Sequence, residues 1–423
     1  MSSFIIKGGK KLKGEIKIAG NKNAMLPIFA ACLLTSEKCI IKNVPNIADG
    51  VAMLEIIKST GAIVEKLSDS SYSIQANKIK NTDLPQELTR KLRGCIILMG
   101  ALTARFKKMS MEHPGGCVIG KRPLNAHLQV MKAFGCNMKI KMNENNTPVY
   151  SVSNKNYKAN ELFLEEQSVT ATENAIIMAT LAPGKTIITN AASEPHVRDL
   201  AEFLNKMGAK ITGHGTNIIE IIGVKKMNGA THTLVSDHLE AISFACLAGA
   251  TKSNLKLTSI IPEDLRMTLI VFDKMNLKYK LDKDTLEIIP SNLISTDKIQ
   301  DGLWPALSTD AISPFVALAT QAKGTTLIHQ WMFEGRLFFI DKLTRMGANI
   351  TLCDPHRALV TGPTKLRAKE VESPDIRAGI TLVIAALIAK GATKIDNIYQ
   401  IERGYENIVE RLRSIGADIT KIS

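Results

Sequence analysis

The chain has 423 residues and a net charge of +14, with 54 Lys and Arg against 40 Asp and Glu. This length predicts two or three domains, and an apolar content of 45% excludes a disordered chain. The longest apolar runs, of about ten residues, are too short to span a bilayer. Since the N-terminal segment has no apolar signal-peptide core, we expect a cytoplasmic protein without a membrane partner.

The charge leaves two alternatives open: a nucleic-acid surface, or a site for a small, highly anionic substrate. The basic residues are dispersed and aromatic residues make up only 5%, so we favour the second. Seven cysteines without ligand spacing disfavour structural zinc and a disulfide framework, and most are predicted to be buried. We expect no metal and no cofactor, because the histidines do not cluster and no nucleotide-binding glycine motif is present.

In chain order, six repeats of about 70 residues follow one another, each with a helix, a strand, a second helix and a second strand. The second helix ends at a residue suited to a left-handed cap, followed by an alternating strand pattern. These markers are Gly61, Gly135, Gly208, Asn276, Gly347 and Gly416. Six repeats of this length predict two similar α/β domains of three repeats each.

The first helix of each repeat is apolar on nearly all sides, which predicts burial, whereas the second is amphipathic, as in 198–208. The predicted starts of the six buried helices carry polar residues: Asn21 to Asn23, Arg90 to Arg93, Ser168, Asp237 and His238, Ser308 to Asp310, and Ser373 to Arg377. Capping explains the Ser, Asn and Asp residues but not Lys22, Arg93 and Arg377, because the helix dipole disfavours cations there. An anion bound between them would account for these cations; surface basic residues are the alternative.

The second repeat contains an insertion within His113–His127, with three glycines, Cys117 and the pair Lys121–Arg122. Glycines permit mobility and close backbone approach, and neighbouring cations favour a thiolate. We interpret this segment as a functional loop; an ordinary flexible loop with an exposed cysteine is the alternative.

Four segments carry a resemblance to the enolpyruvyl transferases: Ala19–Pro27, Pro114–Pro123, Ser308–Asp310 and Glu402–Ile408. The resemblance covers essentially the whole chain. It is stronger to members acting on UDP-N-acetylglucosamine than to EPSP synthases, which have a Lys-Ser pair near the first site and lack the cysteine loop.

The resemblance implies two inside-out α/β domains, each of three βαβαββ repeats, with the active site in the cleft between them. By analogy, 22–230 form one domain, carrying Cys117, and 1–21 with 231–423 form the other, carrying Asp310 and Arg403. The oligomeric state stays open.

The implied reaction transfers enolpyruvyl from phosphoenolpyruvate to the 3′-OH of UDP-N-acetylglucosamine and releases phosphate, the first committed step of peptidoglycan synthesis. It proceeds by addition and elimination through a tetrahedral intermediate. Cys117 matches a loop cysteine that delivers a proton or forms a covalent adduct, and that fosfomycin alkylates. Asp310 matches the carboxylate that takes the 3′-OH proton, and Lys22 a catalytic and substrate-binding cation.

The other roles follow in the same way. Phosphoenolpyruvate binding is implied for Lys22, Asn23, Arg122, Arg377 and Arg403, with Arg336 as a further site arginine. UDP-sugar binding is implied for Asn23, Arg93, Arg122, Pro123, Ser168, Val169, Asp310 and Met332.

Several positions depart from the family pattern, namely Asn125–Ala126, Glu166, Thr170 and 237–242. We interpret them as neutral drift at a site that is read largely by backbone groups; a paralogue that acts on another UDP-sugar is the alternative. A non-catalytic, basic nucleotide-binding or nucleic-acid-binding protein is the alternative from a different class.

Overall fold

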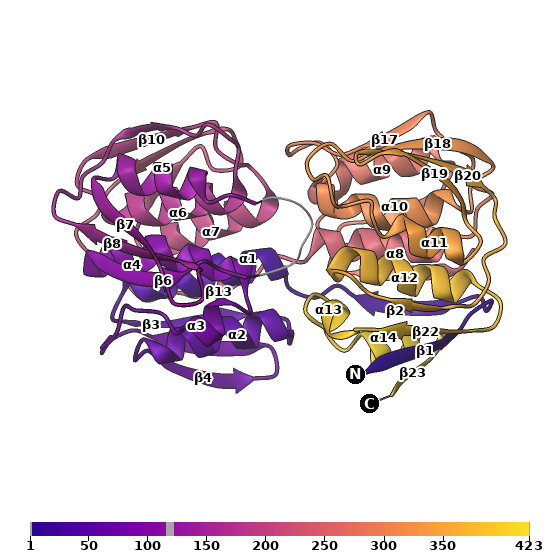
Figure 1. Cartoon of the computed structure of the whole chain (residues 1–423), viewed down its shortest axis with the longest axis horizontal. Coiled ribbons are helices and arrows are strands. Elements are labelled where there is room, and N and C mark those ends of the chain that lie inside the picture. Colours follow the sequence, from indigo (N-terminus) through magenta and orange to yellow (C-terminus); the bar gives the residue numbers. More distant parts are fainter. Residues whose placement is uncertain (1, 116–121, 423) are drawn as a thin grey trace. The chain divides into compact units, whose positions relative to one another are not determined.

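A computed structural model of the chain describes residues 2–115 and 122–422. These residues fall into two compact units (Figure 1): an N-terminal unit of residues 20–115 and 122–235, and a C-terminal unit of 2–19 and 236–422. Each unit has its own hydrophobic core. Cys117 lies outside the described residues, as does Lys121.

The described strands form six sheets, three in each unit, and all follow one pairing scheme. The first strand of a βαβαββ repeat pairs in parallel with the second, the second pairs antiparallel with the fourth, and the fourth with the third. In the second repeat the first strand is reduced to one parallel bridge, Asp83 to Ser110. The expectation of six βαβαββ repeats is confirmed.

The sheets of the N-terminal unit have the strand orders β13-β3-β5-β4, β6-β8-β7 and β9-β10-β12-β11. Their strands are β3 (Lys38–Lys42), β4 (Ile63–Ser68), β5 (Ser71–Gln75), β6 (Lys108–Glu112), β7 (Cys136–Met142), β8 (Pro148–Asn154), β9 (Glu161–Phe163), β10 (Lys185–Thr189), β11 (Lys210–Thr212), β12 (Ile218–Ile222) and β13 (Thr231–Thr233). The helices are α1 (Lys22–Ala31), η1 (Cys32–Leu34), α2 (Ala48–Ser59), α3 (Gln86–Thr89), η2 (Arg93–Ile97), α4 (Leu98–Phe106), α5 (Asn125–Ala133), α6 (Val169–Leu181) and α7 (Pro195–Lys206), where η marks a 3₁₀ helix.

The sheets of the C-terminal unit have the strand orders β2-β14-β16-β15, β17-β18-β20-β19 and β21-β22-β1-β23. Their strands are β1 (Ser3–Lys7), β2 (Lys13–Lys17), β14 (Asn254–Thr258), β15 (Lys278–Leu281), β16 (Thr285–Ile289), β17 (Lys298–Gln300), β18 (Gly324–His329), β19 (Asn349–Asp354), β20 (Arg357–Gly362), β21 (Glu370–Glu372), β22 (Ala392–Asp396) and β23 (Asp418–Ile422). The helices are α8 (His238–Ala250), η3 (Pro262–Leu265), α9 (Arg266–Lys274), η4 (Thr309–Ala311), α10 (Ile312–Ala319), α11 (Ile340–Arg345), α12 (Ile376–Ile388), α13 (Tyr399–Glu402) and α14 (Ile408–Ser414).

Helices occupy the interior of each unit and the sheets lie outside them (Figure 1). The first helices of the repeats are α1, α4, α6, α8, α10 and α12, and nearly all their residues are buried. The second helices bury one face only, as α7 does with Leu200, Phe203 and Leu204. Both expectations are therefore confirmed.

Each of the six marker residues has a positive φ, between 56° at Asn276 and 99° at Gly208 and Gly347. Gly and Asn are the residues that adopt this left-handed conformation at least cost, so the sequence repeat reflects a repeated helix cap.

Strands from both ends of the chain complete the C-terminal unit. β1 pairs with β22 and β23, and β2 pairs with β14. In the N-terminal unit β13 pairs with β3, and the two units meet in sequence at 19/20 and 235/236. The domain limits inferred from the resemblance, at 21/22 and 230/231, stay a prediction.

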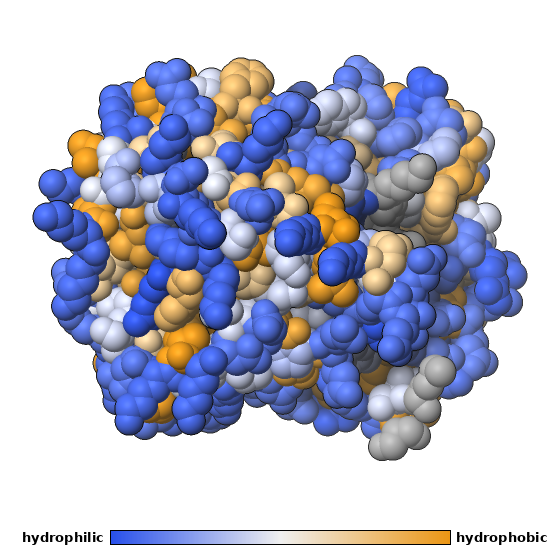
Figure 2. All heavy atoms as spheres, turned by 60° about the vertical axis from the view of Figure 1, so that its left-hand side comes forward, coloured by the Kyte–Doolittle hydropathy of each residue, from blue (hydrophilic) through white to orange (hydrophobic). Residues whose placement is uncertain are grey.

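Hydrophilic side chains cover most of the face in Figure 2, with apolar residues scattered between them. No helix among the described residues is long and apolar enough to cross a membrane. Of the six described cysteines, four are buried, Cys136 is half-buried and Cys353 is exposed, so the expectation that most are buried is confirmed for these residues.

Candidate functional site

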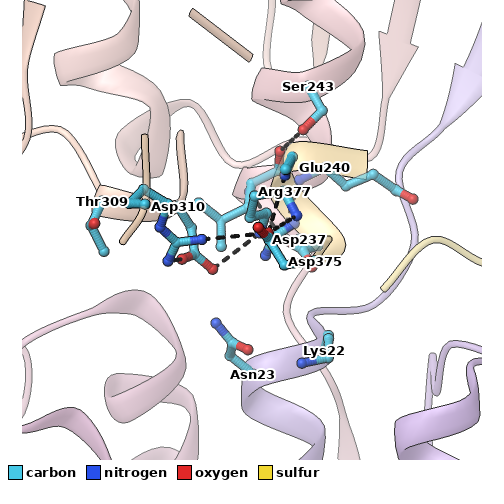
Figure 3. Close-up of polar contacts among 12 residues, drawn as sticks. Lys22, Asn23, Asp237, Glu240, Ser243, Thr309, Asp310, Asp375 and Arg377 are labelled. Carbon is cyan, nitrogen blue, oxygen red and sulfur yellow. Dashed lines mark hydrogen bonds and ion pairs between the residues drawn. The ribbon is translucent and has the colours of Figure 1, made fainter. Parts of the chain in front are cut away.

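In the C-terminal unit, two arginines hold the two carboxylate oxygens of Asp310 (Figure 3). Arg336 Nη2 lies 2.7 Å from Oδ1, and Arg377 Nε lies 3.0 Å from Oδ2. Both arginine side chains are almost fully buried, whereas the Asp310 side chain is 25% exposed. The arrangement fixes the carboxylate in orientation and leaves part of it accessible.

Local structure positions both arginines. Asp375 caps α12 by accepting hydrogen bonds from the amides of Arg377 and Ala378, and it lies 3.8 Å from Arg336 Nη1. The buried Tyr405 hydroxyl accepts a hydrogen bond from Arg377 Nη1 at 3.0 Å. Burial alone would lower the pKa of Arg377, but the nearby Tyr405, Asp310 and Asp237 together raise it. Arg377 is therefore a permanent cation with a fixed direction.

Arg403 directly follows α13, and its side chain is also buried. The adjacent Gly404 allows α13 to approach α12 closely, because a Cβ there would lie 2.5 Å from Ile376 Cγ2. This approach brings Arg403 to the start of the helix that carries Arg377. Met332 lies in the segment between β18 and α11, half-buried.

In the N-terminal unit, Lys22 and Asn23 project from the first turn of α1 (Figure 3). Asn21 caps this helix, since its side chain accepts hydrogen bonds from the amides of Asn23 and Ala24. The Lys22 ammonium lies 3.1 Å from Asp49 Oδ2 on α2. The cation at this helix start is thus balanced in part by a buried carboxylate.

Arg93 begins η2, and Gly94 lets η2 pack tightly on α1 at Leu26. The Arg93 guanidinium donates to the backbone carbonyls of Pro114 and Arg122, and Arg93 Nη1 lies 3.3 Å from His113 Nε2. These partners lie on both sides of the undescribed residues 116–121. Burial lowers the pKa of Arg93 to about 10, and the charge of Arg122 adds to this effect.

Ser168 caps α6, and Val169 is the first residue of that helix. Near this helix start, Thr170 Oγ1 lies 3.0 Å from the Nε2 atom of the buried His127 on α5. The Asn174 amide lies 2.8 Å from His127 Nδ1. Burial lowers the pKa of His127 to about 3, so this histidine is neutral and links α5 to the start of α6. Arg122 and Pro123 precede α5, and the Pro123 ring is exposed.

The helical segment expected to start at Arg90–Arg93 does start at Arg93, but its first turns form the 3₁₀ helix η2, and α4 begins at Leu98. The segment Ser308–Asp310 likewise leads into the 3₁₀ helix η4, with α10 starting at Ile312. Sequence reasoning also missed Tyr405 as a hydrogen-bond partner of Arg377, since 28 residues separate the two. No group of three or more acidic, His or Cys residues suited to a metal ion occurs among the residues described.

The fold resembles that of the enolpyruvyl transferase NikO from Streptomyces tendae, with a TM-score of 0.89 over 99% of this chain and 98% of that one, at 22% identity. The family of EPSP synthase (3-phosphoshikimate 1-carboxyvinyltransferase) matches residues 6–412. The chain therefore belongs to this family.

Two relatives are much closer in sequence, and both are named UDP-N-acetylglucosamine 1-carboxyvinyltransferase. The protein of Treponema denticola is 45% identical, over 99% of this chain and 99% of its own length. That of Borreliella burgdorferi is 41% identical, over 100% and 99% respectively.

Proposed function

We propose that the protein transfers the enolpyruvyl group of phosphoenolpyruvate to the 3′-OH of UDP-N-acetylglucosamine and releases phosphate. The observation that carries the proposal is the Asp310 carboxylate held by two buried arginines, in a chain that matches the two named transferases over its whole length. Both substrates are small and anionic, in keeping with the basic charge of the chain.

The reaction needs two proton transfers at the addition step. The 3′-oxygen loses its proton as it bonds to C2 of phosphoenolpyruvate, and C3 gains a proton to become a methyl group. In the elimination step the methyl group returns a proton and the bond from C2 to the phosphate oxygen breaks. A base for the hydroxyl and an acid for C3 are therefore required.

Asp310 is the proposed base, because a fixed and partly exposed carboxylate can accept the hydroxyl proton. Cys117 is the proposed acid or covalent nucleophile, and Lys22 the catalytic cation. Phosphoenolpyruvate is bound by Lys22, Asn23, Arg122, Arg377 and Arg403 in this proposal, since arginines and lysines stabilise phosphate and carboxylate charge.

The nucleotide sugar would contact a second set: Asn23, Arg93, Arg122, Pro123, Ser168, Val169, Asp310 and Met332. The proposal therefore assigns residues of the predicted domain 22–230 and of the predicted domain 1–21 with 231–423 to one reaction. The departures at Asn125–Ala126, Glu166, Thr170 and 237–242 concern acceptor choice, and another UDP-sugar is the second candidate.

Phosphate release from phosphoenolpyruvate tests the proposal. We expect release only when UDP-N-acetylglucosamine is present, in a panel that also holds other UDP-sugars. If phosphate is released only with a different UDP-sugar, that sugar becomes the proposed acceptor. If phosphate is released with none of them, enolpyruvyl transfer is rejected. Salt-sensitive DNA binding without turnover would favour the alternative of a basic binding protein.

The proposed role of Cys117 predicts selective alkylation. Fosfomycin should add to Cys117 and abolish phosphate release, while the exposed Cys353 remains unmodified and serves as the internal control. Peptide mass spectrometry reads both sites. Equal modification of both cysteines, or none at Cys117, would contradict a specially reactive thiol.

A further inference from the structure

In three of the six repeats, the polar residue that ends the second strand has the same role. Asn43, Asn190 and Asn397 follow β3, β10 and β22, and all three adopt a left-handed backbone with φ of 55° to 58°. Each donates its side-chain amide to the backbone carbonyl of the residue that follows the neighbouring parallel strand. These acceptors are Leu234, Leu164 and Ser373. The amide thus joins the ends of two parallel strands.

In the fifth repeat the equivalent residue is Gln330, which follows β18. Gln330 does not adopt the left-handed conformation, and its amide donates to the side chain of Asp301 instead of a backbone carbonyl. Asp301 follows β17, the parallel neighbour of β18, so it occupies the place of the residue whose carbonyl accepts this bond in the three repeats above. Gln330 is fully buried and Asp301 is 2% exposed.

The Gln330 carboxamide makes three contacts, in addition to the two contacts of its backbone with His356. Nε2 donates to the Asp301 carboxylate and, at 2.6 Å, to the Thr309 hydroxyl. Oε1 accepts the Phe333 amide hydrogen at 2.7 Å. Thr309 precedes Asp310, and Phe333 lies three residues before Arg336. One side chain therefore connects the turn carrying Asp310 to the segment carrying its ion-pair partner.

We propose that Gln330 is a positioning residue, which holds the Asp310 turn and the Arg336 segment in the one register that allows their ion pair. The inference rests on the proposed function, in which Asp310 is the base. In the fifth repeat, the side-chain amide of Gln330 joins the ends of two parallel strands and also contacts the turn at Thr309 and the segment at Phe333. A small displacement of a base lowers turnover far more than it lowers substrate affinity.

A pair exchange tests this role. Gln330→Glu places two carboxylates against each other and removes the donor to Thr309. The double variant Asp301→Asn with Gln330→Glu swaps donor and acceptor, because the new amide at position 301 donates to the new carboxylate at position 330. That carboxylate also accepts from the Thr309 hydroxyl and still accepts the Phe333 amide hydrogen.

Two further variants complete the set. Thr309→Val is a milder change that removes one acceptor of the Gln330 amide. Gln321→Glu is the matched control, because Gln321 bridges Thr320 and Thr364 at the other end of α10.

We expect Gln330→Glu to lower kcat about tenfold or more, with KM for phosphoenolpyruvate changed less than about threefold. The double variant should recover kcat to within about threefold of the unaltered protein, Thr309→Val should fall between them, and Gln321→Glu should keep full kcat. Unchanged kcat in Gln330→Glu, or no recovery in the double variant, would overturn the inference. If Gln330→Glu does not fold, Thr309→Val decides: an unchanged kcat rejects the role.

Amide hydrogen exchange gives a readout independent of turnover. Segments 308–311 and 330–336 should lose protection together in Thr309→Val and Gln330→Glu, and regain it in the double variant. Loss of protection in 330–336 without loss in 308–311 would refute the proposed coupling of the two segments. If the unaltered protein releases no phosphate, the proposed function fails, while the exchange result still decides whether Gln330 couples the two segments.

Discussion

At the scale of single residues, Asp310 combines fixed orientation with partial exposure. Asp310→Asn keeps the shape and one carbonyl oxygen but cannot take up the hydroxyl proton. We expect kcat to fall by about two to four orders of magnitude, the usual contribution of a general base. Phosphate release measures this loss.

The control for this variant is its thermal unfolding, which should show a folded protein, since Arg377 also bonds to Tyr405. Lysine in place of Arg336 would be a less informative change, because it alters the ion pair and the packing together. Turnover of Asp310→Asn within threefold of normal would remove the carboxylate from the mechanism.

A second residue-scale prediction concerns Glu194, at the start of α7. Burial raises the pKa of this carboxyl to about 7, and its Oε2 has no hydrogen-bond partner among the described residues. The folded state therefore holds the proton more tightly than the unfolded state does. The free energy of unfolding should fall as the pH rises from about 5 to about 8, where the folded protein must bury the ionised form.

Glu194→Gln should flatten this pH dependence and make the protein more stable than the unaltered chain at pH 8, measured by urea unfolding. Glu202→Gln is the control, since Glu202 lies on the same helix with its side chain 45% exposed. Equal slopes for the unaltered protein and Glu194→Gln would show that another group dominates.

At the scale of elements, the six left-handed helix caps permit a comparison within one chain. Gly416 has φ of 95°, and a Cβ added there would meet nothing within 4 Å. Gly416→Ala should therefore cost about 1 kcal/mol through backbone strain alone. Gly416→Asn should cost less, because Asn276 occupies the equivalent cap with φ of 56°. The urea midpoint of each variant tests the order; an alanine variant as stable as the asparagine variant would contradict it.

Elements and networks differ in how far the sequence predicts them. The marker residues and the apolar helices are local patterns, so the repeats and buried helices could be inferred directly. The short first strands could not be predicted from local patterns, because three residues, as in β13 or β21, are too few to show the alternation of apolar and polar residues. Ser168 and Asp237 are recognisable caps, whereas the bond between Gln330 and Asp301 joins residues 29 positions apart and depends on parallel pairing of β17 and β18. The roles assigned by resemblance, including that of Cys117, stay predictions.

At the scale of the whole molecule, the charge of +14 is divided between the proposed site and the surface. Lys22, Arg93 and Arg122 belong to the N-terminal unit, and Arg336, Arg377 and Arg403 to the C-terminal unit. The lysines of β7, such as Lys139 and Lys141, are exposed and are not among the proposed site residues. Salt screens charges that lie more than about 10 Å apart at 0.1 M. We therefore expect the six proposed site cations, and not the exposed lysines of β7, to act strongly on a bound anion.

This division predicts a specific dependence on salt. Raising NaCl from about 0.02 to about 0.5 M should lower kcat/KM for phosphoenolpyruvate while kcat changes little, because screening weakens the attraction of a multiply charged anion. Arg403→Gln should make the decline with salt shallower, whereas the control Lys139→Gln with Lys141→Gln should leave its slope unchanged. The slopes of both variants are measured by steady-state kinetics at constant pH, with chloride as the only varied anion. If both variants reduce the slope equally, the total charge of the molecule, and not the residues assigned to the site, governs the encounter with substrate.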